Sequence, residues 1–209
     1  MPGGLSSLTP TNQDMANKMK TKVILAILAL FYSVLPATYA NSSTDGIDAV
    51  AKLAIGLQDY ILGKPLITDQ INKAQDNLLD NSYEGTYRFQ DGSLLIVAAK
   101  NNDMVLAIRK QYDSATGDNF RSILVDLMND FGEPTTMAHE KIVYWAYGKN
   151  GKISQEQYKD AKDTGKLDSI LTVKLNSSEE FDPIIAGDKK EADVYLLISS
   201  ETILKQFVN

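Results

Sequence analysis

"YEGTYRFQDGSLLIVAAKNNDMVLAIRKQY", residues 83–112, is the stretch that decides the fold. Aromatic and branched residues dominate three runs within it, and such residues favour β-strands. The runs are separated by Asp91-Gly92 and by Asn101-Asn102, dipeptides that suit tight hairpin turns. The stretch therefore predicts three antiparallel strands connected as a meander.

The residues after this stretch repeat the same order of elements. A helix is predicted from Asp118 to Phe131, because a capping residue precedes apolar side chains at helical spacing and Gly132 follows them. Three more strands and a last helix are predicted over residues 140–147, 169–176, 192–199 and 201–208. We expect an α+β fold in which an antiparallel sheet of about six strands, built as two βββα units, carries helices packed on it.

Residues 44–81, ahead of the first strand, have helical periodicity. Apolar residues recur at spacings of three and four from Ile47 to Ile61, and Gly63 and Pro65 interrupt the pattern. A second apolar stripe begins after Thr68. The segment predicts an N-terminal helical hairpin.

Residues 19–40, "MKTKVILAILALFYSVLPATYA", have the layout of a secretory signal peptide, with a basic start, an apolar run and small residues at the end. The apolar run from Val23 to Leu35 is shorter than the roughly 20 residues that span a bilayer, so we expect cleavage between Ala40 and Asn41. Residues 1–18 are polar and aperiodic, and translation is expected to begin at Met19, with Met15 and Met1 as alternatives. The exported chain, 41–209, has the length of a single domain.

The charge and the absence of cysteine exclude several classes of function. The chain has 21 basic and 27 acidic side chains; without residues 1–40 it keeps 18 basic and 26 acidic ones. An acidic balance disfavours nucleic acid and anionic membrane surfaces as partners. With no cysteine, the chain has neither thiolate catalysis nor thiolate metal ligands. We expect a soluble bacterial protein of the periplasm or the extracellular medium.

The stretch "FGEPTTMAHEKIVYWAYG", residues 131–148, contains the only tryptophan and the only histidine. Its second half predicts a strand with Trp145 and Tyr147 on one face and Tyr144 on the other. Both faces are apolar, which indicates either burial on both sides or a face that meets a partner. Trp145, Tyr147 and Tyr144 are therefore the candidate binding residues.

The candidate catalytic residues are Glu133, His139 and Glu140. A histidine beside carboxylates can act as acid and base in a hydrolase. A zinc site needs three protein ligands, and the chain has no second histidine to provide one. The sequence has no nucleophile motif of the Gly-x-Ser-x-Gly type, and we expect no metal and no cofactor. The sequence thus favours a non-catalytic module that binds a protein or peptide. A periplasmic hydrolase and an acidic inhibitor or immunity-type protein are the alternatives.

Overall fold

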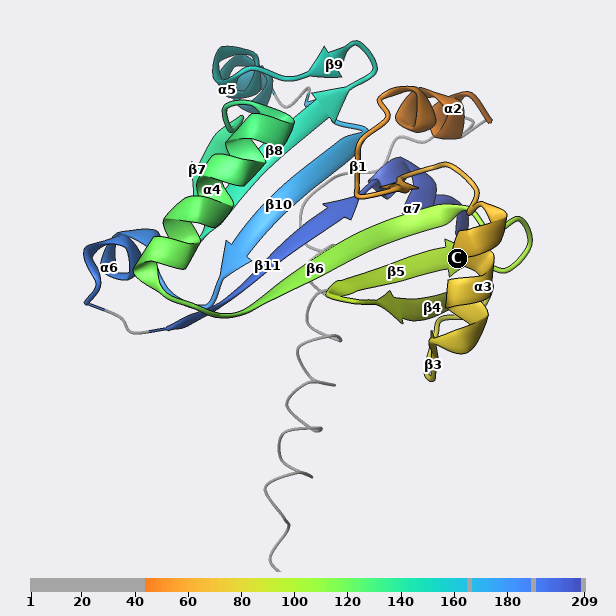
Figure 1. Cartoon of the computed structure of the whole chain (residues 1–209). Helices are drawn as coiled ribbons and strands as arrows, with labels where there is room; N and C mark the ends of the chain where they lie inside the picture. The colour runs from red at the N-terminus through yellow and green to blue at the C-terminus, as the bar shows by residue number, and fades with distance from the viewer. Residues whose placement is uncertain (1–43, 165–166, 189–190, 208–209) are drawn as a thin grey trace, which may run out of the picture. The chain divides into compact units, whose positions relative to one another are not determined.

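The computed structural model describes residues 44–164, 167–188 and 191–207 (Figure 1). The predicted signal peptide, its cleavage site and the start of translation lie outside these residues. The described residues fall within one unit of the chain, Asn41–Asn209. None of the helices in this part of the chain has both the length and the apolar character needed to cross a bilayer.

The predicted α+β class with an antiparallel sheet is confirmed. Among the described residues, nine strands form one sheet in the order β3-β4-β5-β6-β11-β10-β8-β7, and β9 pairs with the end of β8. Six long strands carry most of the pairing: β4 (Thr86–Asp91), β5 (Leu94–Ala99), β6 (Val105–Ala115), β8 (Ile142–Gly148), β10 (Leu171–Ser177) and β11 (Ala192–Ser199). The short strands are β3 (Leu78–Leu79), β7 (Thr136–Ala138) and β9 (Gly151–Lys152).

The predicted meander is formed by β4, β5 and β6. Asp91 pairs with Leu94, which leaves Gly92 and Ser93 as a two-residue turn. Gly92 has φ +58° at the first central position, a conformation that glycine adopts without steric cost. The hairpin turn thus forms one residue later than the predicted Asp91-Gly92, with Gly92 at its first position.

The two sets of strands meet at the centre of the sheet through β6 and β11. Ile198 of β11 pairs with Ile108 of β6, although residues 116–191 lie between the two strands. On its other side β11 pairs with β10, and β10 pairs with β8. The last strand of the second set thus joins the last strand of the first set.

Helix α4 (Gly117–Phe131) connects β6 with the second set of strands. It begins one residue after Thr116 and not at Asp118, and Gly132 follows it with φ +71°. Phe120, Leu127 and Phe131 are buried, whereas Met128 is 43% exposed.

Three shorter helices follow: α5 (Gln155–Thr164), α6 (Phe181–Ala186) and α7 (Glu201–Phe207). Ser154 and Gln157 form a capping box at the start of α5, with N···O distances of 2.9 and 3.2 Å. The hydroxyl of Ser200 accepts a hydrogen bond from the backbone N–H of Ile203 at 3.2 Å and so caps α7. Helix α6 was not predicted from the sequence, because its six residues lie in a connection rich in acidic residues.

The N-terminal region contains α2 (Thr44–Lys52), β1 (Gly56–Leu57), β2 (Tyr60–Ile61) and α3 (Thr68–Asp76). The predicted helical hairpin is not confirmed, because the β1-β2 ribbon separates the helices, which contact different elements: α3 contacts β4, and α2 contacts α7. A Cβ on Gly56 would lie 1.9 Å from the carbonyl oxygen of Tyr60, so glycine permits this close pairing.

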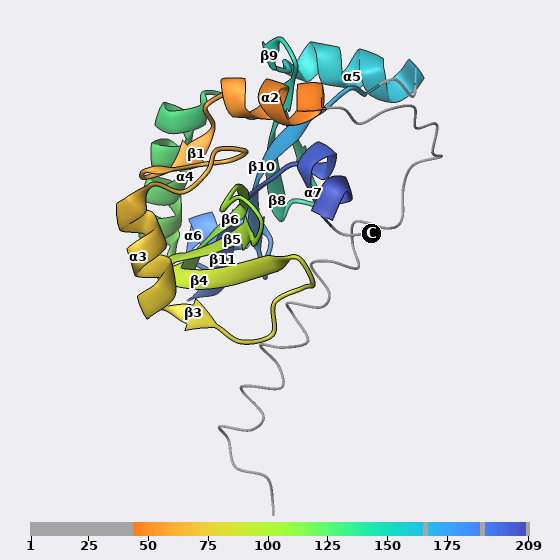
Figure 2. The same cartoon turned by 90° about the vertical axis from the view of Figure 1, so that its right-hand side faces the viewer.

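The sheet has two different faces. Figures 1 and 2 show α3 and α4 on one side of the strands and α7 on the other. The face below α3 and α4, called the covered face, is apolar and buried, and includes Phe89, Leu94, Ile96, Ile108, Val143, Trp145, Val173, Leu175, Leu196 and Ile198. The hydrophobic effect acts mainly on this face.

Candidate functional site

The opposite face of the sheet, called the open face, carries polar and aromatic side chains that are partly exposed. The strand register places one residue from each of six neighbouring strands in a single line across this face, the central row. The row is Tyr144, Lys174, Leu197, Arg109, Leu95 and Gln90, on β8, β10, β11, β6, β5 and β4. All six are neither buried nor fully exposed. Aromatic, cationic and leucine side chains therefore lie at one level across the sheet.

Lys174 and Tyr144 face each other across β10 and β8. The Lys174 ammonium lies 5.3 Å from the centroid of the Tyr144 ring, within the range of a cation–π interaction. Burial lowers the pKa of Lys174, and the nearby Glu201 carboxylate opposes this effect. Burial also raises the pKa of Tyr144. Both side chains thus belong to a partly desolvated surface.

Arg109 is the second cation of the central row. Its guanidinium carbon lies 4.9 Å from the centroid of the Tyr195 ring, and its Nη2 donates to the side-chain oxygen of Gln111. Its Nε is buried and has no hydrogen-bond partner. Burial lowers the pKa of Arg109, while Tyr195 and Asp113 raise it, and an arginine keeps its charge under all these conditions. The guanidinium therefore lies close to an aromatic ring and is poorly solvated.

Leu197 lies between the two cations, because it pairs with Lys174 on one side and with Arg109 on the other. Leu95 lies beyond Arg109 on β5. The row therefore alternates in the order cation, leucine, cation, leucine. Interfaces between proteins are enriched in tyrosine and arginine around apolar contacts, and this composition matches such a surface.

The structure separates the three predicted binding residues. Trp145 is fully buried on the covered face, where its indole N–H donates to the carbonyl of Gly132 at 2.7 Å and its ring lies 6.0 Å from that of Phe131. Tyr147 is 6% exposed on the same face. Tyr144 is the one member of the three that reaches the open face. The burial of Trp145 and Tyr147 indicates a role in packing.

The predicted acid–base set is not assembled in one place. His139 and Glu140 are exposed in the turn between β7 and β8, with φ of +53° and +54°. Glu133 is exposed before β7, so this strand separates it from the histidine. Nowhere in the described ranges do three or more His, Cys, Asp or Glu side chains gather in a way that could hold a metal ion. His139 therefore lies in a solvent-exposed turn.

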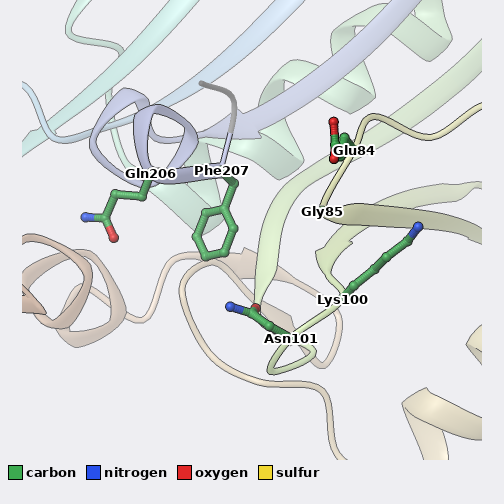
Figure 3. Close-up of a pocket in the computed structure, with 6 residues that line it drawn as sticks. All are labelled: Glu84, Gly85, Lys100, Asn101, Gln206 and Phe207. Carbon is green, nitrogen blue, oxygen red and sulfur yellow. The ribbon is translucent and has the colours of Figure 1, made fainter.

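Figure 3 shows a pocket at another end of the sheet, lined by Glu84, Gly85, Lys100, Asn101, Gln206 and Phe207. Its lining comes from the approach to β4, the turn after β5 and the end of α7. The buried Nε2 of Gln206 has no hydrogen-bond partner. The lining contains one carboxylate, Glu84, and one ammonium group, Lys100, but no histidine, serine or second carboxylate.

Arg109, Lys174 and Tyr195 were not among the binding residues predicted from the sequence. Each lies at an outward position of a strand with alternating character, where a polar side chain is the ordinary expectation. The sequence does show Arg109 and Lys174 in the middle of apolar strands, which could have marked them as candidates. Only the strand register shows that these residues lie side by side.

Comparisons of this chain with models of protein families, with the curated proteins and with the solved structures found no match.

Proposed function

We propose that this protein is an exported, non-catalytic binding module that receives a protein or peptide partner on the open face of its sheet. The observation that carries the proposal is the central row, in which Tyr144, Leu197 and Arg109 remain partly exposed although they lie on central strands of the sheet. The solvated face of an antiparallel sheet is usually polar, so the tyrosine and leucine side chains of this row add apolar area to it. A partner that covers them gains burial energy on binding.

The dimensions of the open face favour a macromolecular partner. Neighbouring strands lie about 4.8 Å apart, so a row across six strands measures roughly 24 Å. This length suits a helix or a strand of a partner, whereas a small ligand requires a concave site that surrounds it. Tyrosine and arginine are also the residues that most often dominate protein–protein binding energy.

Export is proposed from the leader-like residues 19–40. Expression of the full chain in a bacterial host, followed by N-terminal sequencing of the periplasmic or secreted product, tests it. Asn41 as the first residue supports export with cleavage. A product that stays in the cytoplasm with its leader intact contradicts it.

Binding is tested with the exported product and two variants. Wild type, Leu197→Asp and His139→Asn are immobilised and exposed to periplasmic and extracellular fractions, and a captured protein is purified and bound again in isolation. Hydrogen exchange of the purified complex is then measured. We expect wild type and His139→Asn to retain the partner, Leu197→Asp to lose it, and protection to concentrate in β6, β10 and β11. Protection confined to the β7-β8 turn contradicts the proposal.

A further inference from the structure

We propose that the partner presents an acidic amphipathic helix, in which two carboxylates seven residues apart flank an apolar residue, to Lys174, Leu197 and Arg109. This inference rests on the proposed function and adds the chemistry of the partner. Three features of the central row carry it: the state of Arg109, the spacing of the two cations, and the leucine between them.

Arg109 lacks an ion-pair partner among the described residues. Its Nη2 contacts an uncharged amide, its Nε is buried without an acceptor, and no salt bridge to it is found in this part of the chain. Asp113 is four residues along the same strand, about 13 Å away at the usual rise per residue, and acts on Arg109 only at long range. A desolvated cation without an anion is costly, and a carboxylate from a partner offsets that cost through charge-assisted hydrogen bonds.

The two cations have a defined separation. Lys174 and Arg109 lie on either side of Leu197 in the register, so two strand spacings, about 10 Å, separate their backbones. In an α-helix, residues i and i+7 lie on one face and are about 10.5 Å apart along the axis. A helix that crosses the strands along the central row therefore matches both cations at once.

Leu197 favours an apolar residue between the two carboxylates of the partner helix. It is partly exposed at the midpoint of the two cations, with the Tyr144 and Tyr195 rings close to them. A residue at i+3 or i+4 of the same helix falls at this midpoint. An apolar side chain there buries against Leu197, and it excludes water from the two ion pairs, which strengthens them. The overall charge of −6 opposes a uniformly acidic polymer, so the attraction is local to the row.

The probes are three fluorescein-labelled, alanine-rich helical peptides. The first has glutamates at i and i+7 with a leucine between them, the second has glutamines in place of both glutamates, and the third has its glutamates at i and i+5, on different faces of the helix. Fluorescence anisotropy measures their binding to wild type and to Arg109→Gln, Lys174→Gln and Leu197→Asp. Lys159→Gln, which removes an exposed cation of α5, is the matched control.

We expect the first peptide to bind wild type about tenfold more tightly than the other two, and added salt to weaken its binding. Arg109→Gln should weaken binding about tenfold, Lys174→Gln several-fold, and Lys159→Gln less than about twofold. The double variant Arg109→Glu, Lys174→Glu reverses both charges. It should instead prefer the first peptide with lysines in place of its two glutamates. Circular dichroism confirms that each variant is folded.

Three results overturn the inference: no binding of the first peptide, equal binding of the glutamate and glutamine peptides, or insensitivity to Arg109→Gln. Equal binding of the two peptides that is lost in Leu197→Asp rejects the acidic partner but leaves the open face as a binding surface. The capture experiment tests the proposed function separately. If Leu197→Asp retains the purified partner, the open face is not the binding surface.

Discussion

The two faces of the sheet are built from residues that are neighbours in the sequence but differ in their surroundings. Ile108 is fully buried and Arg109 is partly exposed; the same contrast separates Leu196 from Leu197. Successive side chains of a strand point to opposite faces, so one covered face leaves an alternating pattern of burial. The covered face holds the domain together, whereas the open face contributes less to stability and is the proposed binding surface.

The largest expected effect comes from placing the same charge on each face. Leu196→Asp puts a carboxylate into the fully buried layer between the sheet and its helices, at a cost that approaches the whole stability of a typical domain. We expect this variant to be unfolded by circular dichroism. Leu197→Asp should remain folded and lose binding. If Leu196→Asp and Leu197→Asp were equally well folded, the two faces would not differ in their contribution to stability.

Truncation of adjacent aromatic residues gives the next largest effect. Trp145→Ala removes a fully buried ring and its hydrogen bond to Gly132, so we expect a loss of about 3–5 kcal/mol in the free energy of unfolding. Tyr144→Ala should cost about 1 kcal/mol, because its ring is already partly in water. Urea denaturation of the two variants measures the difference, and similar costs would mean that the open face is also packed.

A smaller, pH-dependent effect is expected at Tyr147. Burial raises the pKa of Tyr147 from 10.0 to about 12, so the unfolded chain releases the phenolic proton before the folded chain does. The stability contributed by this shift is present below pH 10 and is lost as the pH rises to about 12. Wild type should lose about 2 kcal/mol more than Tyr147→Phe over this interval. Parallel pH dependence in urea titrations of the two proteins would contradict the burial of the hydroxyl.

The smallest effect is expected in the β7-β8 turn, which belongs to neither face. His139→Asn keeps a side chain that tolerates the positive φ of +53°, and the imidazole it removes is exposed. Stability should change by less than about 0.5 kcal/mol, and partner binding should be unchanged. Purified protein assayed against ester, peptide and phosphate substrates should show no activity that depends on this residue. A loss of turnover in His139→Asn would favour the hydrolase alternative.

Local sequence patterns predicted the elements whose stability depends on near neighbours. Trp145 and Tyr147 lie on one face of their strand as predicted, and a hairpin turn forms at Gly92, although it consists of Gly92 and Ser93 and not of Asp91 and Gly92. The prediction was wrong where a tertiary contact outweighed the local pattern. Residues 56–61 resemble a helical stripe, but they form a narrow ribbon that Gly56 permits.

The sequence by itself determined which segments are strands or helices and which side of each strand is apolar, because turn geometry, capping and side-chain periodicity act over a few residues. Only the tertiary structure decided that β11 inserts beside β6, and this pairing places Lys174, Leu197 and Arg109 in one row. The physical reason is that pairing between distant strands depends on the burial of the whole covered face. The open face receives its arrangement of cations and leucines as a consequence.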